Sequence, residues 1–355
     1  WILKIDLKTI YILEILDFGF PRKVYNRSIY FDDMDNLTLF SRFRLYKETV
    51  LHLVTLIEDE LEFPNMNNSV SPINQLLTCL RFYASAGHLN AVADFMEMDV
   101  STTSRITCRV SEAIAPRFIN MPVRNDIFRY QTKFHNVARF PRVIGLVDGT
   151  HIKIQSPGGD DAEIYRNKKG YFSINVQVTC DADLKLQDVV ARWPGSAHDS
   201  TMFINSHLRF RFENGEFPNS FLIGDSGYAL KNYFLTPLAN PVTRSEQLYN
   251  ESLIRTRNIV ERVIGIWKRR FPVLAYGMRI KLETVLTTIV ATAVLHNIAR
   301  EMNEPEPPAP LDIDIDHLHY LIAMGQIPDP PPAANDNVVP NYAQQQLIQH
   351  YFNNL

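Results

Sequence analysis

The stretch VIGLVDGTHIKI, residues 143–154, decides the fold class of this 355-residue chain. It opens with five apolar residues, Val143 to Val147, which is typical of a strand buried on both faces. Asp148 follows this run directly, and Asp225 stands two residues after a second apolar run, Phe221 to Ile223. Carboxylates placed after central strands lie in the crevice where α/β folds bind ligands. We therefore expect Asp148 and Asp225 to share one site.

The neighbouring patterns complete an α/β domain around these two runs. The expected elements are strands at 172–178 and 187–193 and helices near 200–208, 251–271 and 282–302. Strands that come first and helices that come later predict a mixed sheet flanked by helices over residues 121–302.

Helical spacing of apolar residues also dominates the chain before this domain. Residues 1–69 read as a helical region that ends in a turn, and residues 70–120 read as three short helices, the third one capped near Asp99. That third helix carries Ser104, Arg105 and Arg109, which we place on its outer face. The segment alone fits a DNA-binding helix-turn-helix and a plain three-helix bundle equally well.

Composition and charge narrow the partners and the compartment. The formal net charge is −3, so a DNA-binding surface must be local. Three cysteines without a C-x-x-C pair argue against a disulfide framework or a cysteine zinc site. No apolar run looks long enough to cross a bilayer, and we expect a soluble intracellular protein. Residues 303–355 read as a proline-rich linker followed by a C-terminal helix that docks on the body or on a partner.

A third acid, Glu261, lies on the helix expected at 251–271. At about 100° per residue, Arg257, Glu261 and Lys268 share one stripe beside the apolar arc of that helix. In-line cleavage of a phosphodiester needs an activated water and a stabilised leaving oxygen, which two divalent ions can provide together. Asp148 would bridge two Mg²⁺ or Mn²⁺ ions, and Asp225 and Glu261 would each complete one.

Further polar side chains stand around these acids in the sequence. Asp199 fits a fourth metal ligand and the N-cap of the helix near Ser200 equally well. His151 and His198 lie beside the acids, and we favour structural hydrogen bonds for both. Arg257 and Lys268 would hold DNA phosphate nearby.

Several motifs in this order resemble the PIF/Harbinger transposases and their domesticated relatives. They are VDGTHI at 147–152, YRNKKGY at 165–171, WPGSAHDS at 193–200, IGDSGY at 223–228, LTP at 235–237 and LHNI at 295–298. The 35 residues between Asp225 and Glu261 also resemble the family spacing. Arg257, Glu261 and Lys268 resemble a signature that the family shares with bacterial insertion-sequence transposases. In those bacterial proteins the signature begins with a Tyr, and Ile254 stands in that place here.

The resemblance implies a ribonuclease H-like fold with Asp148, Asp225 and Glu261 as the acidic triad. It favours the helix-turn-helix at 72–117, a nuclear location and a Myb/SANT-like partner, and we count Lys168 and Lys169 among the DNA contacts. A homodimer would handle two DNA ends. We weigh an active DNA endonuclease or transposase against a domesticated DNA-binding protein that no longer cuts. A phosphoesterase for small substrates is the weaker third reading.

Overall fold

The structure is a computed structural model that describes residues 31–62, 69–85, 87–117, 119–308 and 341–355. Within these ranges five strands form one sheet in the order β3-β2-β1-β4-β5. They are β1 (Val143–Lys153), β2 (Ser173–Cys180), β3 (Leu186–Pro194), β4 (Phe221–Ile223) and β5 (Phe234–Leu235). The first three strands pair antiparallel, and β4 and β5 run parallel to β1. This topology confirms the expected ribonuclease H-like mixed sheet.

The first strand is longer than the apolar run predicted. It continues through Asp148 to Lys153 because β2 pairs with it from Leu146 to Lys153. On its other side the parallel pairing with β4 ends at Leu146, opposite Ile223. The expectation that the strand stops before Asp148 was therefore wrong. Asp148 lies within β1, just past the point where that strand loses its neighbour β4.

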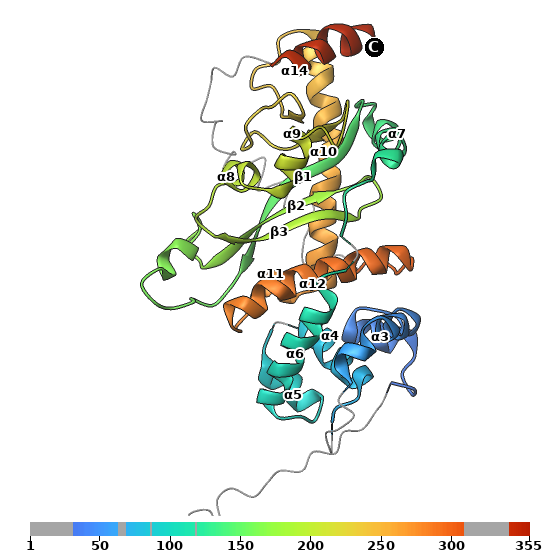
Figure 1. Cartoon of the computed structure of the whole chain (residues 1–355), viewed down its shortest axis with the longest axis vertical. Helices are drawn as coiled ribbons and strands as arrows, with labels where there is room; N and C mark the ends of the chain where they lie inside the picture. The colour runs from blue at the N-terminus through green and yellow to red at the C-terminus, as the bar shows by residue number, and fades with distance from the viewer. Residues whose placement is uncertain (1–30, 63–68, 86, 118, 309–340) are drawn as a thin grey trace, which may run out of the picture.

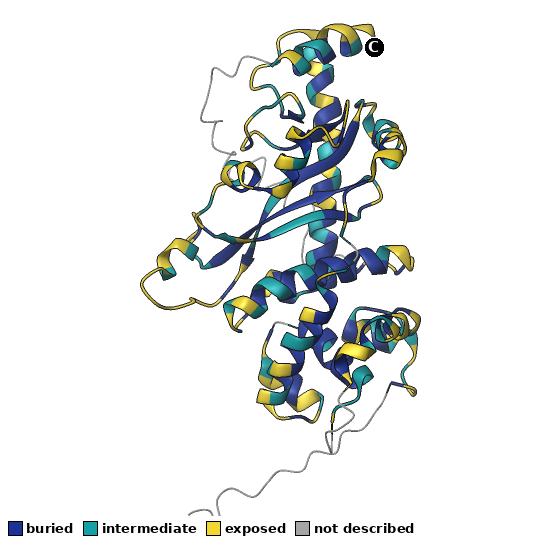
Figure 2. Ribbon diagram, viewed as in Figure 1, coloured by how far each residue is buried: buried dark blue, intermediate teal, exposed yellow. Residues whose placement is uncertain are grey.

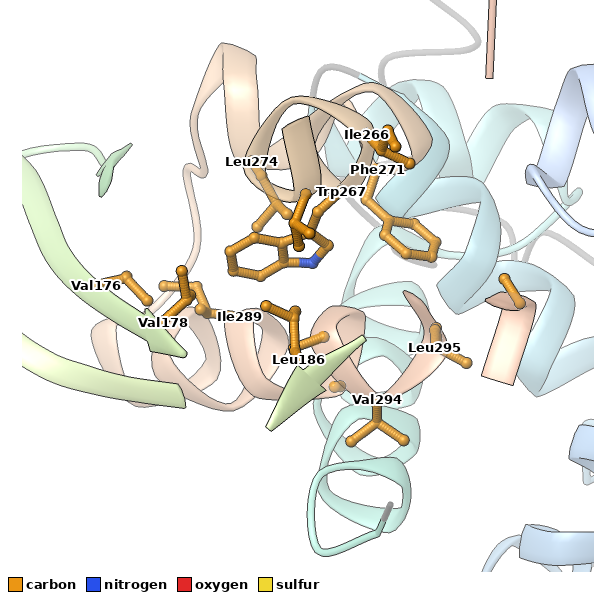
Figure 3. Close-up of a cluster of buried hydrophobic side chains, with 14 of the residues drawn as sticks. Val176, Val178, Leu186, Ile266, Trp267, Phe271, Leu274, Ile289, Val294 and Leu295 are labelled. Carbon is orange, nitrogen blue, oxygen red and sulfur yellow. The ribbon is translucent and has the colours of Figure 1, made fainter. Parts of the chain in front are cut away.

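Helices cover both faces of the sheet (Figure 1). One face packs on α10 (Arg244–Arg270), α11 (Val273–Tyr276) and α12 (Leu282–Glu301), and the other packs on α8 (Asp199–Ile204) and α9 (His207–Glu213). A 3₁₀ turn, η1 (Arg124–Asp126), leads into α7 (Ile127–Ala138), which packs on β1, and η2 (Ala162–Tyr165) lies between β1 and β2. Trp267 and Phe271 fill the core under α10 together with side chains of β2, β3 and α12 (Figure 3).

An all-helical region precedes the sheet, as expected. Its helices are α2 (Asn36–Phe43), α3 (Lys47–Leu61), α4 (Pro72–Ala84), α5 (Leu89–Phe95) and α6 (Val100–Ile114). The predicted cap is confirmed, since the Asp99 carboxylate accepts the backbone N–H of Ser101 at 2.8 Å. The turn predicted at 64–68 lies outside the described residues.

This region and the sheet share one continuous core through α12 (Figures 1 and 2). The Ser111 hydroxyl of α6 lies 2.7 Å from the Tyr83 hydroxyl and 3.4 Å from that of Thr288 on α12. Among the described helices, α12 alone has the length and apolar composition of a membrane span, contrary to the sequence expectation. Two-thirds of that apolar stretch, 67%, is buried inside the protein, as in a core helix.

The chain after α12 does not leave the body at once. Glu304 is buried, and its Oε1 accepts the backbone N–H of Tyr46 at 2.7 Å and the hydroxyl of Thr49 at 2.5 Å. The linker expected from residue 303 therefore begins as packed structure. The C-terminal segment comprises α14 (Tyr342–Gln346), a π-helical turn η3 (Leu347–Tyr351) and a 3₁₀ turn η4 (Phe352–Asn354). It docks on the body, where Phe352 packs on Phe140 and Tyr249.

Candidate active site

Asp148 and Asp225 occupy the crevice where β4 ends beside β1. Within the described residues, the Asp148 carboxylate accepts one hydrogen bond, from the Gly149 N–H at 2.8 Å. Burial, and after it the negative charge of Asp225, together raise the pKa of Asp148 to about 7. Burial also raises the pKa of Asp225, whose carboxylate accepts the N–H of Gly227 at 3.0 Å. The charge of Asp225 thus acts on Asp148, and both carboxyl groups have a raised pKa.

Arg257 on α10 is a cation whose charge acts on both aspartates. Its guanidinium opposes the rise in pKa of Asp148 and of Asp225. The same guanidinium holds Glu261 by an ion pair of 2.7 Å, and Glu261 remains 52% exposed. Arg257 and Glu261 therefore lie side by side on α10, as expected. The charge of Glu261 acts on Asp225, so a third acid lies within electrostatic range of that residue.

Among the residues that the structure describes, no group of three or more His, Cys, Asp or Glu side chains is gathered closely enough to hold a metal ion. Asp148 and Asp225 nevertheless fit a hard divalent cation, because they are half-buried, mutually repelling carboxylates with oxygen atoms to offer. Glu261 offers a further carboxylate, of which Arg257 holds Oε1.

Asp199 reaches the same crevice from α8. The N-cap of α8 is His198 and not Asp199, so the capping interpretation of Asp199 was wrong. Its Oδ1 instead accepts the Asn175 side-chain N–H at 2.9 Å. The carboxylate rests on Gly149, where an added Cβ would lie 2.6 Å from Oδ1. Whether Asp199 is a metal ligand stays a prediction.

Tyr228 is a component of the site to which the sequence reasoning assigned no role. Its ring is buried against Phe203 and Phe234, at centroid distances of 6.2 and 5.0 Å. Its hydroxyl has no hydrogen-bond partner among the described residues. Burial first, and then the charges of Asp199, Asp148 and Asp225, raise the pKa of Tyr228 well above its ordinary value. The IGDSGY motif was the signal that pointed to this residue.

His151 and Lys268 lie on the other flank of the crevice. His151 Nδ1 lies 3.1 Å from the Ser173 hydroxyl, which agrees with the structural hydrogen bond expected for it. Lys268 donates to the backbone oxygen of His151 at 3.0 Å, and burial lowers its pKa to about 8. Lys268 therefore braces α10 on β1. Lys168 and Lys169 are exposed at the turn between β1 and β2.

The predicted contacts of the helix-turn-helix differ in exposure. Arg105 is exposed, while Ser104 is half-buried. Arg109 is turned toward α4, where its Nη1 donates to Gln75 Oε1 at 3.2 Å. Arg109 therefore takes part in packing α6 on α4, and DNA contact by these three residues stays a prediction.

Comparison with known proteins places this arrangement in a family. Residues 147–297 match the family described as "DDE superfamily endonuclease". The chain is 32% identical over 276 residues to "Putative nuclease HARBI1" of Mus musculus, covering 76% of this chain and 79% of that protein. The Homo sapiens protein of that name is 31% identical over 278 residues, with the same coverage.

A plant protein is more distant. "Protein ALP1-like" of Arabidopsis thaliana is 25% identical over 309 residues, or 81% of this chain and 75% of that protein. No solved structure matches the chain. The sheet order, the acids in the crevice and these similarities lead to one assignment: the chain belongs to the PIF/Harbinger family of DDE transposases and transposase-derived nucleases.

Proposed function

We propose that the chain is a divalent-metal-dependent DNA endonuclease or transposase that cuts phosphodiester bonds with Asp148, Asp225 and Glu261. The observation that carries this proposal is the pair of half-buried, mutually repelling carboxylates where β4 ends beside β1. Mg²⁺ or Mn²⁺, when bound there, supplies an activated water and stabilises the leaving oxygen. Asp148 and Asp225 would hold the metal, and Glu261 and Asp199 would add further oxygen ligands.

The remaining residues of the site position these acids. Asn175 fixes the carboxylate of Asp199 by its bond of 2.9 Å. Lys268 ties α10, and with it Glu261, to the backbone of β1. Arg257 balances the charge of the acids until Glu261 is released, and its guanidinium then suits a DNA phosphate in the crevice.

Single substitutions test the proposal on a supercoiled plasmid with Mg²⁺ or Mn²⁺. Asp148→Asn, Asp225→Asn and Glu261→Gln should each abolish nicking and leave the fold intact. Glu251→Gln is the matched control, because Glu251 forms the equivalent i,i+4 ion pair with Arg255 on the same helix. Nicking at the wild-type rate by any of the three variants would disprove the site.

A second candidate function is DNA binding without cleavage, as in a domesticated transposase. The ion pair that holds Glu261 on Arg257 favours it, since Oε1 of the third acid is then occupied by a cation of the chain itself. A wild-type chain that binds DNA but leaves plasmid intact in both metals would establish this alternative.

The family relationship also leads us to propose a nuclear location and a Myb/SANT-like partner that adds to DNA recognition. Microscopy of the tagged chain tests the first, and its co-purification with a Myb/SANT-type protein tests the second. Sedimentation with two DNA ends tests whether the chain acts as a homodimer.

A further inference from the structure

Three exposed lysines line the hairpin end of the sheet. Lys153 ends β1, and Lys168 and Lys169 lie in the turn before β2. None of them forms an ion pair with an acid of the described residues, and Lys153 lies 5.9 Å from the ring centroid of Tyr171. The charge of Lys169 reaches His151 and Lys268, which places it beside the crevice.

The connection between α11 and α12 is fixed against this hairpin end. The N–H of Met278 donates to the backbone oxygen of Lys153 at 3.1 Å, and the N–H of Gln155 donates to that of Met278 at 3.0 Å. Gly277, at φ +103°, lets the connection approach closely, because an added Cβ would lie 3.1 Å from the Lys153 side chain. The next residues, Arg279 and Lys281, are both exposed and are likewise without an acidic partner among the described residues.

The same connection reaches the helix-turn-helix. Helix α12 begins at Leu282, and the Thr284 hydroxyl contacts Cys108 of α6 at 3.6 Å. The charge of Lys281 acts on Cys108 as well, so Lys281 borders α6. Figure 1 shows the hairpin, the start of α12 and α6 following one another along one side of the molecule. Two exposed acids, Glu112 and Glu283, lie near the Lys281 end of this series of cations. A surface that attracts phosphate would therefore end there.

We propose that Lys153, Lys168, Lys169, Arg279 and Lys281 form a phosphate-binding track that guides one DNA duplex from α6 to the acidic crevice. The inference rests on the proposed DNA function and adds a path that the catalytic residues do not define. Exposed acids, Asp160 and Asp161, stand in the same hairpin. Neither of them forms an ion pair with the five cations, which leaves those cations available to phosphate. Duplex DNA fits this track because its phosphates continue from a helix-turn-helix to a site of strand cleavage.

The test removes three of these cations together, as Lys153→Gln, Arg279→Gln and Lys281→Gln in one chain. Binding of a duplex is measured over a series of salt concentrations without divalent cations, so cleavage does not enter. Each lost phosphate contact lowers the salt slope by about 0.9, and we expect a slope reduced by about 2 to 3. All three side chains are exposed, so the thermal midpoint should not change.

The matched control is Lys185→Gln, Arg209→Gln and Arg262→Gln, which removes equal charge from cations that are held in ion pairs. It should keep the wild-type slope. An equal slope for the track variant and the wild type would overturn the track. If the track variant has the reduced salt slope but the wild-type chain never cleaves DNA, the track is retained and the nuclease is rejected. The two proposals therefore fail separately.

Discussion

The two faces of the sheet differ in chemistry although both are buried. On β2, Ile174, Val176 and Val178 face the apolar core under α10 and α12 (Figure 3). The residues between them, Asn175 and Gln177 among them, face α8 and α9 and are buried just as completely. Figure 2 shows this strand dark blue along its length. The first face is apolar, and the second is a polar layer under a helical cover.

The polar layer leads to the active site. Asn175 bonds to Asp199, and Gln177 lies opposite Gly149 on β1. Farther along, the Thr179 hydroxyl, both amide atoms of Gln187 and Asp188 Oδ2 have no hydrogen-bond partner among the described residues. An unsatisfied buried polar group costs about 1–3 kcal/mol. The difference teaches that one face stabilises the sheet, while the other gives up stability to hold Asp199 beside the site; Asp148, opposite Val178, lies on the first face.

The apolar face should show the largest effect on stability. Trp267→Ala removes the largest side chain of that core, which is fully buried. The lost contacts and the resulting cavity should lower the free energy of unfolding by about 3–5 kcal/mol. Urea unfolding measures this change, with Tyr276→Ala at an exposed aromatic position of neighbouring α11 as the control. A loss below about 1 kcal/mol would mean that this face does not dominate stability.

The polar face should show its largest effect on activity. Gly149→Ala places a methyl group against the Asp199 carboxylate, which must move away from Asn175. A misplacement of about 1 Å can lower a rate by about 100-fold, and we expect a loss of that order in plasmid nicking. Gly265→Ala on α10 is the control, because its added Cβ meets only the tip of Arg269, at 3.2 Å. Wild-type nicking by Gly149→Ala would remove Asp199 from the site.

The sequence predicted the sheet and the positions of the main acids, because apolar runs and the residues after them are local signals. It did not predict that β1 continues through Asp148, since that depends on the ladder with β2. The sequence also did not predict that α8 starts at Asp199, because an Asp in the first turn of a helix and an Asp at its N-cap look alike in sequence. The inward turn of Arg109 depends on Gln75 of another helix.

Lowering the pH should change the stability contributed by a buried group on each face in opposite directions. His296, on α12, is fully buried, its Nε2 lies 2.8 Å from the Leu184 oxygen, and burial lowers its pKa to about 4. Its contribution to stability is therefore present above pH 6.5 and is lost as the pH falls toward 4. Asp188, on the polar face, has a pKa raised by burial to about 6. Its contribution is present below its ordinary value of about 3.8 and is lost as the pH rises through 6.

Two variants separate these contributions. His296→Gln should flatten the loss of stability between pH 6.5 and 4, by an amount on the order of 2–3 kcal/mol. Asp188→Asn should remove a loss of similar order between pH 4 and 6. Thermal melting of each variant across this range, compared with wild type, gives the two differences. Differences of the same sign would show that the faces do not differ in this respect.

The smallest effect is expected where the polar layer is least bonded. Gln177→Leu replaces an amide whose two polar atoms lack partners among the described residues with an apolar side chain of similar size. Removal of an unsatisfied polar group is nearly neutral or stabilising, so the free energy of unfolding should change by less than about 1 kcal/mol or rise. Asn175→Leu is the paired variant, because Asn175 bonds Asp199 and the Ala197 oxygen. If Gln177→Leu cost as much stability as Asn175→Leu, the amide of Gln177 would have to be bonded in solution, and the polar layer would be a satisfied network.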